Sequence, residues 1–164
     1  MSSTVKTVFV VLFVLSAGIF AIATPIEVGS GDNTAGLYIE WKDGFSADFA
    51  VSFSADSVTG LELLGIAADN SDLDIVTISS VWGEYLDGMS YQGHDNSGFG
   101  GGEDWWHYWI NDGGEDWISA LVGASTRLVQ NGSADGWVYG TDTIPEPATI
   151  GLLGLGGLLL RKRS

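Results

Sequence analysis

Aromatic side chains gather in the second half of the chain, in a pattern that could bind a sugar. Five of the seven tryptophans lie there, and five consecutive residues carry rings, among them Trp105, Trp106, His107 and Trp109. Side chains alternate between the two faces of a strand, so Trp105, His107 and Trp109 would share one face. If exposed, that face and nearby Trp117 would stack against a small ligand or a carbohydrate. The alternative is that both faces are buried in the core, and the exposure of the rings decides between the two.

Two groups of carboxylates have enough oxygen atoms to bind calcium weakly. A Ca²⁺ ion takes about six to eight oxygen ligands, which carboxylates and backbone carbonyls supply. Neither group matches the loop of an EF-hand, so solvated acidic loops are the alternative. We expect no other cofactor. The two groups are Asp69, Asp72 and Asp74, and Asp112, Glu115 and Asp116.

Motifs of common enzymes do not occur in the sequence. It has no H-E-x-x-H, G-x-S-x-G or P-loop pattern, and its only histidines are His94 and His107. The glycine-rich run at 98–102 lacks the lysine of a phosphate-binding loop. We therefore expect a protein without catalytic activity. A hydrolase that uses two carboxylates in a cleft is a less favoured alternative.

The charges exclude several classes of protein. The chain has 164 residues, with 6 Lys+Arg against 21 Asp+Glu, and it has no cysteine. Nucleic-acid binding needs clustered basic residues, and disulfides or cysteine-bound metals need cysteine, so these classes are excluded. Between residues 25 and 144 there are 20 acidic residues and only two basic ones, Lys42 and Arg127. We expect Arg127 to pair with Asp116 or Asp135.

Short strands and one helix account for the acidic body. Alternating apolar residues predict strands, and apolar residues at helical spacing after an N-cap at Ser57 or Thr59 predict a helix. The fold class is therefore α+β, a small and mostly β-sheet domain with one short helix. About 120 residues bury a usable core without disulfides. The expected elements are strands at 37–41, 47–53, 75–78 (buried), 105–110, 127–129 and 136–139, a helix at 59–68, a short strand or turn at 81–85, and a glycine-rich loop at 89–103.

The first 23 residues have the features of a secretory signal peptide. An uncharged apolar run at 8–23 follows Lys6, and it ends on the small residues Ala21 and Ala23. Signal peptidase, the partner that this pattern implies, reads small residues at these two positions, so we expect cleavage after Ala23. A retained N-terminal anchor is the alternative.

The C-terminus combines a Pro-Glu-Pro sequence, a short hydrophobic sorting helix at 148–160 and a basic cluster. Thirteen helical residues reach only about 20 Å, whereas the hydrocarbon core of a bilayer is about 30 Å thick. We therefore expect transient insertion in the inner membrane as a transmembrane helix, with the basic cluster on the cytoplasmic side, rather than a permanent anchor. The residues outside the apolar run are Pro145, Glu146, Pro147, Arg161, Lys162 and Arg163.

This arrangement resembles a PEP-CTERM sorting signal over residues 144–164. The resemblance implies a bacterial protein that is recognised by an exosortase and moved to the cell surface or into the exopolysaccharide matrix. The exosortase would supply the nucleophile, so Glu146 would be a recognition residue rather than a catalytic one. The alternative is a plain tail anchor that follows a proline linker.

The exported domain between the two signals, residues 24–143, resembles transcobalamin C-terminal-like domains over residues 49–139. The resemblance implies a β-rich domain. We expect a secreted protein with a structural or binding role, and a domain that binds a small ligand or carbohydrate is the alternative. The residues that carry the resemblance are the aromatic stretch at 105–109, Asn111, Gly123-Ala124, Asp135-Gly136 and Trp137-Val138-Tyr139.

Overall fold

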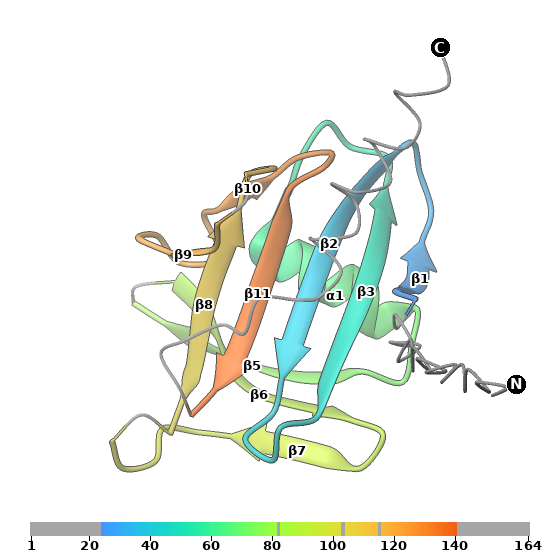
Figure 1. Ribbon diagram of the computed structural model, residues 1–164. Coiled ribbons are helices and arrows are strands. Elements are labelled where there is room, and N and C mark those ends of the chain that lie inside the picture. Colours follow the sequence, from blue (N-terminus) through green and yellow to red (C-terminus); the bar gives the residue numbers. More distant parts are fainter. Residues whose placement is uncertain (1–23, 82, 103, 115, 141–164) are drawn as a thin grey trace, which may run out of the picture.

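The computed structural model describes residues 24–81, 83–102, 104–114 and 116–140 (Figure 1). The predicted signal peptide at 1–23, with Ala21 and Ala23, and the predicted sorting signal at 144–164 lie outside these residues. Within the described ranges, no helix is long and apolar enough to cross a membrane. The elements are β1 (Ile26–Gly29), β2 (Asn33–Glu40), β3 (Ser46–Phe53), β4 (Val58–Thr59), α1 (Gly60–Asp69), β5 (Asp74–Ser80), β6 (Gly83–Tyr91), β7 (His94–Ser97), β8 (Trp106–Asn111), β9 (Ile118–Ser119), β10 (Leu128–Val129) and β11 (Ala134–Tyr139).

A six-stranded sheet forms the larger layer, in the order β1-β3-β2-β11-β8-β9. β1 runs parallel to β3 and β11 runs parallel to β2, whereas the other neighbours are antiparallel. β11 comes last in the sequence but lies between β2 and β8. β11 therefore joins the strands β1, β3 and β2 on one side to β8 and β9 on the other.

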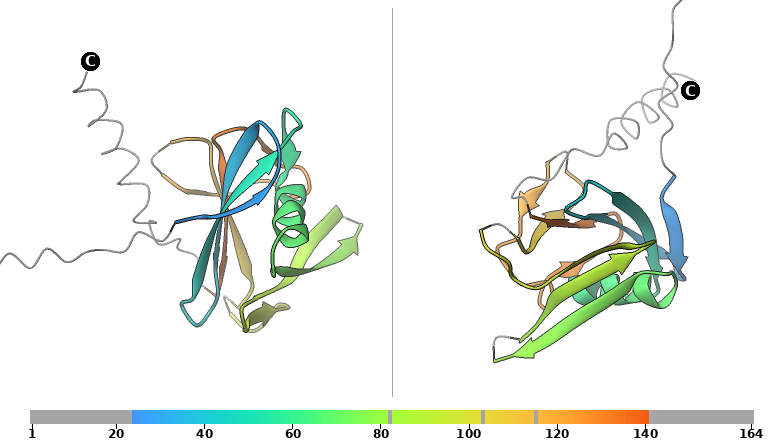
Figure 2. Two further views of the ribbon diagram at one scale, coloured as in Figure 1. Left: turned by 90° about the vertical axis from the view of Figure 1, so that its right-hand side faces the viewer. Right: turned by 90° about the horizontal axis from the view of Figure 1, so that it is seen from below.

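α1 lies against one face of the large sheet, as Figure 2 shows. The side chains on this face are mostly apolar and form the core. Leu37 of β2 lies opposite Phe49 of β3, and alternation puts both side chains on this face, where they are buried. The helix contributes Leu63 and Leu64, which are fully buried. Burial of these apolar side chains is the main source of stability for the domain.

Trp41 joins the large sheet to a second sheet of three strands, in the order β5-β6-β7. Its indole Nε1 donates a hydrogen bond to the carbonyl of Met89 in β6, at 3.1 Å. Its ring lies 6.1 Å from that of Trp106 and 6.3 Å from that of Tyr91, measured between centroids. A single buried indole thus contacts both sheets and satisfies its own donor.

The N-terminus of α1 is capped by Thr59, one of the two candidates from the sequence. The side chain of Thr59 accepts from the backbone of Glu62, and the side chain of Glu62 accepts from the backbone of Thr59, which is a capping box. The second bond, to the Thr59 backbone N–H, lowers the pKa of Glu62. The N–H groups of Gly60 and Leu61 donate to the carbonyls of Arg127 and Ala124 at 3.1 Å. The first turn is therefore held by a loop distant in sequence.

The prediction of a small, mostly β-sheet domain with one short helix is confirmed, and five predicted strands correspond to β2, β3, β8, β10 and β11. The prediction of a buried strand at 75–78 is wrong about burial. β5 is a strand, but it lies at the edge of the small sheet, where Val76 and Ile78 are exposed.

The predicted loop at 89–103 is wrong for residues 89–97. β6 begins at Gly83 and continues to Tyr91, and a turn at Gln92-Gly93 leads into β7. Both turn residues have positive φ angles, 51° and 90°, which suit a tight hairpin. Gly88 lies within β6. A side chain at this position would clash, because its Cβ atom would come within 2.9 Å of the Ser97 Cβ of β7. Glycine here serves close strand packing rather than a loop.

Candidate functional site

The inward face of β8 belongs to the core. Trp106 is buried, with its ring 5.2 Å from that of Tyr139 in β11 and edge-on to it. Its Nε1 donates to the carbonyl of Asn96 at 3.3 Å. For Trp106, the structure therefore supports the buried alternative over ligand binding.

Trp105, His107 and Trp109 lie on the opposite side of the sheet, and we call these three residues the outer aromatic face. Trp105 is 36% exposed, and its ring centroid lies 3.7 Å from that of His107, which is buried. Trp109 and nearby Trp117, which precedes β9, are partly buried. Their indole nitrogens are buried and have no hydrogen-bond partner. The predicted grouping of Trp105, His107 and Trp109 on one side is present, but only Trp105 offers a substantially open ring.

A groove of about 430 Å³ lies elsewhere on the large sheet, over β1, β2 and β3. β11 separates the groove from β8, so the groove does not extend the outer aromatic face. Its residues are small or polar and include no ring, unlike the apolar lining that is typical of ligand pockets. The groove is lined by Glu27, Val28, Gly29, Thr34, Ala50 and Ser52.

The carboxylates that were candidates for calcium do not converge on one point. Among the described residues, no group of three or more Asp, Glu or His side chains could hold a metal ion. Asp69 ends α1 and Asp74 begins β5, with Asp72 in the connection between them. In the second group, Asp112 binds Arg127 and Asp116 uses its backbone carbonyl to accept from Asn111. Glu115 lies outside the described residues, and calcium binding stays a prediction.

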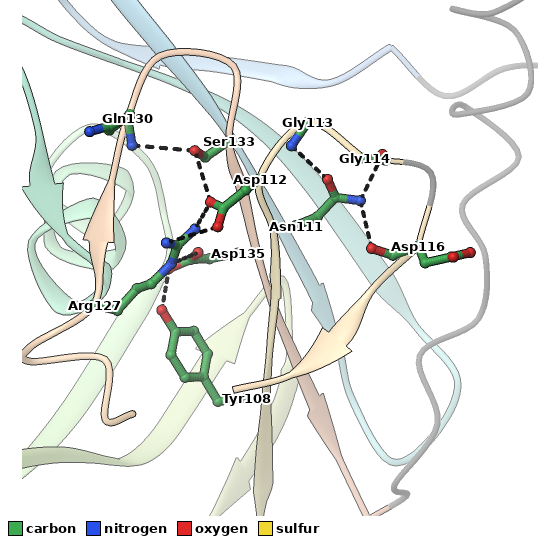
Figure 3. A network of polar contacts seen from close by, with 10 residues as sticks. All are labelled: Tyr108, Asn111, Asp112, Gly113, Gly114, Asp116, Arg127, Gln130, Ser133 and Asp135. Carbon is green, nitrogen blue, oxygen red and sulfur yellow. Dashed lines mark hydrogen bonds and ion pairs between the residues drawn. The ribbon is translucent and has the colours of Figure 1, made fainter. Parts of the chain in front are cut away.

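A buried carboxylate, Asp135, forms the centre of a polar network (Figure 3). It lies on β11 and is fully buried, and its Oδ2 accepts a hydrogen bond from the Tyr108 hydroxyl on β8. The Nε of Arg127 lies 3.6 Å from Asp135 Oδ1, and the guanidinium also binds Asp112. The predicted pairing of Arg127 with Asp135 is thus present, and Asp112 takes the place expected for Asp116. Ser133 donates to Asp112 at 3.3 Å.

The loop after β8 is folded so that Asp112 points at the guanidinium of Arg127. The Asn111 amide donates to the carbonyls of Gly114 and Asp116, at 3.2 and 3.3 Å, and accepts from the N–H of Gly113 at 2.9 Å. These three bonds fix the loop from within, as Figure 3 shows. Asn111 is therefore a positioning residue for the network.

Burial is the main influence on the protonation of the network. It raises the pKa of Asp135 to about 6, although the hydrogen bond from Tyr108 and the charge of Arg127 act in the opposite direction. Burial and the neighbouring Asp135 also raise the pKa of Tyr108. Burial alone would lower the pKa of Arg127, but Asp112 and Asp135 outweigh this effect and the pKa is raised. Asp135 Oδ1 and Arg127 Nε both lack a hydrogen-bond partner. The carboxylate is therefore only partly compensated.

The enclosed position of Asp135 favours a structural role for the network over a catalytic one. Gly60, at the start of α1, lies directly over the pair that Asp135 forms with Tyr108. A Cβ atom on Gly60 would come into steric conflict with the Tyr108 hydroxyl and within 2.7 Å of Asp135 Oδ2. Asp135 is fully buried, so a ligand could reach the carboxylate only if surrounding residues moved. The network instead links α1, β8 and β11.

The alternation of β11 in the sequence is a signal for this buried carboxylate, although a polar network centred on it was not predicted. Asp135, Trp137 and Tyr139 occupy alternate positions of β11, so they share the face that packs against α1. Alternation alone therefore places Asp135 among buried aromatic residues. Identifying its partners Tyr108 and Arg127 required the pairing of strands that are distant in sequence.

The substitution Asp135→Asn tests the protonation of the buried carboxylate. Because burial raises the pKa of Asp135 to about 6, the folded state holds its proton to higher pH than the unfolded chain. The wild type should therefore lose stability relative to D135N by about 1–3 kcal/mol as the pH rises from 4 to 7. Urea unfolding at intervals of one pH unit measures this difference. D56N, which removes one exposed carboxylate, is the control. If the stability of the wild type relative to D135N rises with pH, the proposed protonation is contradicted.

The contact beneath the helix is tested by two glycine substitutions in α1. Gly60→Ala should destabilise the domain by about 1–3 kcal/mol, because its Cβ has no room against Tyr108 and Asp135. Gly65→Ala, in the same helix, meets nothing within 4 Å and should stabilise it by up to about 1 kcal/mol. Thermal or urea unfolding compares them. Equal effects of the two substitutions would show that helix propensity, and not the contact, decides the outcome.

Comparison with known proteins bears on the C-terminus. The family model of the PEP-CTERM protein-sorting motif matches residues 143–164, which confirms the resemblance seen in the sequence to within one residue. No curated protein matches the chain. The resemblance of residues 49–139 to transcobalamin C-terminal-like domains stays a prediction. The motif implies processing by an exosortase and an exported protein directed to the cell surface. The chain thus carries a PEP-CTERM protein-sorting motif at its C-terminal end.

Proposed function

We propose that the domain is a non-catalytic module that is delivered to the cell surface or the exopolysaccharide matrix and has a structural or binding role there. The observation that carries the proposal is the sorting motif at residues 143–164. Signal peptidase would remove residues 1–23, and the exosortase would act near Pro145-Glu146-Pro147. The folded domain that precedes the motif would be the delivered product.

The distribution of charge supports a role among anionic polymers. The two basic residues of the acidic body are both held in ion pairs, Lys42 with Asp104 at 2.7 Å and Arg127 with Asp112. Most of the other acidic residues that the structure describes thus have no lysine or arginine partner. Such a surface keeps a protein soluble, and divalent cations could bridge it to acidic polysaccharide. In this proposal calcium acts as a diffuse counterion and needs no dedicated site.

The sorting step is tested by replacing the Pro-Glu-Pro sequence with alanine, as P145A/E146A/P147A. In a host with an exosortase, the wild type should lose its C-terminal residues and leave the membrane fraction. The variant should keep them and stay with the membrane, because the enzyme has lost its recognition sequence. Mass spectrometry and cell fractionation measure both effects. T141A, just before the motif, is the control, and identical masses and fractions for the wild type and the triple variant would refute the proposed sorting step.

A second candidate function is carbohydrate binding at the outer aromatic face. The observation that favours it is the exposed ring of Trp105, which lies close to the ring of His107 at a tilt of 30°. Flat aromatic rings hold sugars by contact with the apolar face of the pyranose. This candidate specifies the binding role and leaves the sorting of the chain unchanged.

The substitution Trp105→Ala tests this candidate. It should reduce retention of the protein on exopolysaccharide from its host by about tenfold, because one exposed ring would supply most of the contact. F99A is the matched control, since Phe99 is also an exposed aromatic residue but packs against Tyr85, away from β8. Affinity electrophoresis in gels with and without the polysaccharide gives the comparison. Equal retention of W105A and wild type would leave the structural role as the remaining candidate.

A further inference from the structure

The hairpin of β5 and β6 projects away from the rest of the domain. Figure 2 shows it extending past α1, with β5 along its outer side. In the part of the chain that the structure describes, β5 pairs with β6 on one side and with no strand on the other. Its seven residues thus present a row of backbone groups along a free edge.

β5 differs from the other edge strands among the described residues. In the large sheet, the edge strands β1 and β9 have four and two residues, and β7 at the far edge of the small sheet has four. Short edges leave little room for another strand, which is a common protection against unwanted pairing. β5, with seven residues, has no such protection.

The β5 edge is also regular, and Asp74 at its start is its only charged residue. The bulge between β5 and β6 places its extra residue, Asp87, on β6, so β5 itself is not interrupted. Val76 is 54% exposed and Ile78 is 39% exposed. No proline or charged residue occurs between Asp74 and Glu84.

We propose that two copies of the protein associate through their β5 strands, antiparallel and with Thr77 on the two-fold axis. The three-stranded sheets of the two copies would then form one continuous sheet of six strands. The association rests on β5 alone and is independent of the proposed function.

The side chains of β5 are complementary to themselves in this register. Pairing about Thr77 puts Val76 opposite the partner's Ile78, and the symmetry repeats this pair on the other side of the axis. Two β-branched side chains that are exposed in one copy would cover each other in the dimer. Asp74 would lie opposite the partner's Ser80, so the two Asp74 carboxylates do not face each other.

The charge of the protein favours this edge over other surfaces for contact between copies. The chain has a net charge of −15, so two copies repel each other through most of their surfaces. The run from Ile75 to Gly83 carries no charge, so the backbones can meet there. The carboxylates nearest the axis are those of the two Glu84 residues, each of which accepts a hydrogen bond from Thr77. Because the remaining repulsion acts at a distance, salt should screen it and strengthen the dimer.

Cysteine cross-linking tests the register directly, because the chain has no cysteine of its own. In the proposed dimer, the Cα atoms of the two Thr77 residues would be about 5 Å apart, within the range of a disulfide. T77C should therefore form a disulfide-linked dimer under mild oxidation. S79C is the matched control, since its two copies would be about 14 Å apart and should stay monomeric. Equal cross-linking of the two variants overturns the proposal.

Sedimentation of the uncross-linked protein tests the association itself. The full chain, prepared in the same way for every variant, should dimerise more strongly at 0.5 M than at 0.05 M NaCl. Ile78→Lys should weaken the dimer by about tenfold or more, because it puts a charged side chain into the apolar pairing. L121K also replaces an exposed aliphatic side chain by lysine, but outside the hairpin, so the dissociation constant of the dimer should stay within about twofold of wild type. A monomeric wild type, or a dimer that I78K leaves intact, overturns the proposal.

Discussion

The close contact between the first turn of α1 and the buried pair of Tyr108 and Asp135 is the constraint on which the domain depends. Only glycine at position 60 leaves room for both side chains. The positive end of the helix dipole lies over the carboxylate, which offsets part of the cost of its burial. The same turn donates to the carbonyls of Ala124 and Arg127. One contact thus fixes the helix, the central strands and the loop before β10.

The buried charges and the surface charges of the domain have different roles. The buried guanidinium of Arg127 compensates part of the Asp135 charge and holds the loop that carries Asp112. Lys42 makes an exposed pair with Asp104, which contributes little to stability because water screens it. Asp43 contacts His94, and most of the other carboxylates that the structure describes have no lysine or arginine partner. The interior therefore uses charge for specificity, and the surface uses it for solubility and for contact with the surroundings.

Local sequence patterns were enough to predict β3 and α1. β3 alternates regularly, and α1 begins with a capping box, so both were predicted nearly to their ends. The start of β6 was predicted only as a short strand or turn at 81–85. The rest of β6 and β7 were missed because the glycine-rich run at 98–102 suggested that the whole stretch from residue 89 was a loop. The alternation of β8 placed Trp105 and Trp106 on opposite sides. Which side is buried depends on β11 and α1, and that information is not local.

A binding or structural role in a matrix places a requirement on the number of contact surfaces. A monomer with one surface for polysaccharide can coat a polymer chain, but it cannot hold two chains together. A dimer through β5 would carry two outer aromatic faces and two acidic surfaces, and each could contact a different polymer. Contacts that are weak one by one become strong when two act from the same particle. The exposed β5 edge and the acidic surface would then serve one purpose, because the edge joins the copies and the surface of each copy contacts the matrix.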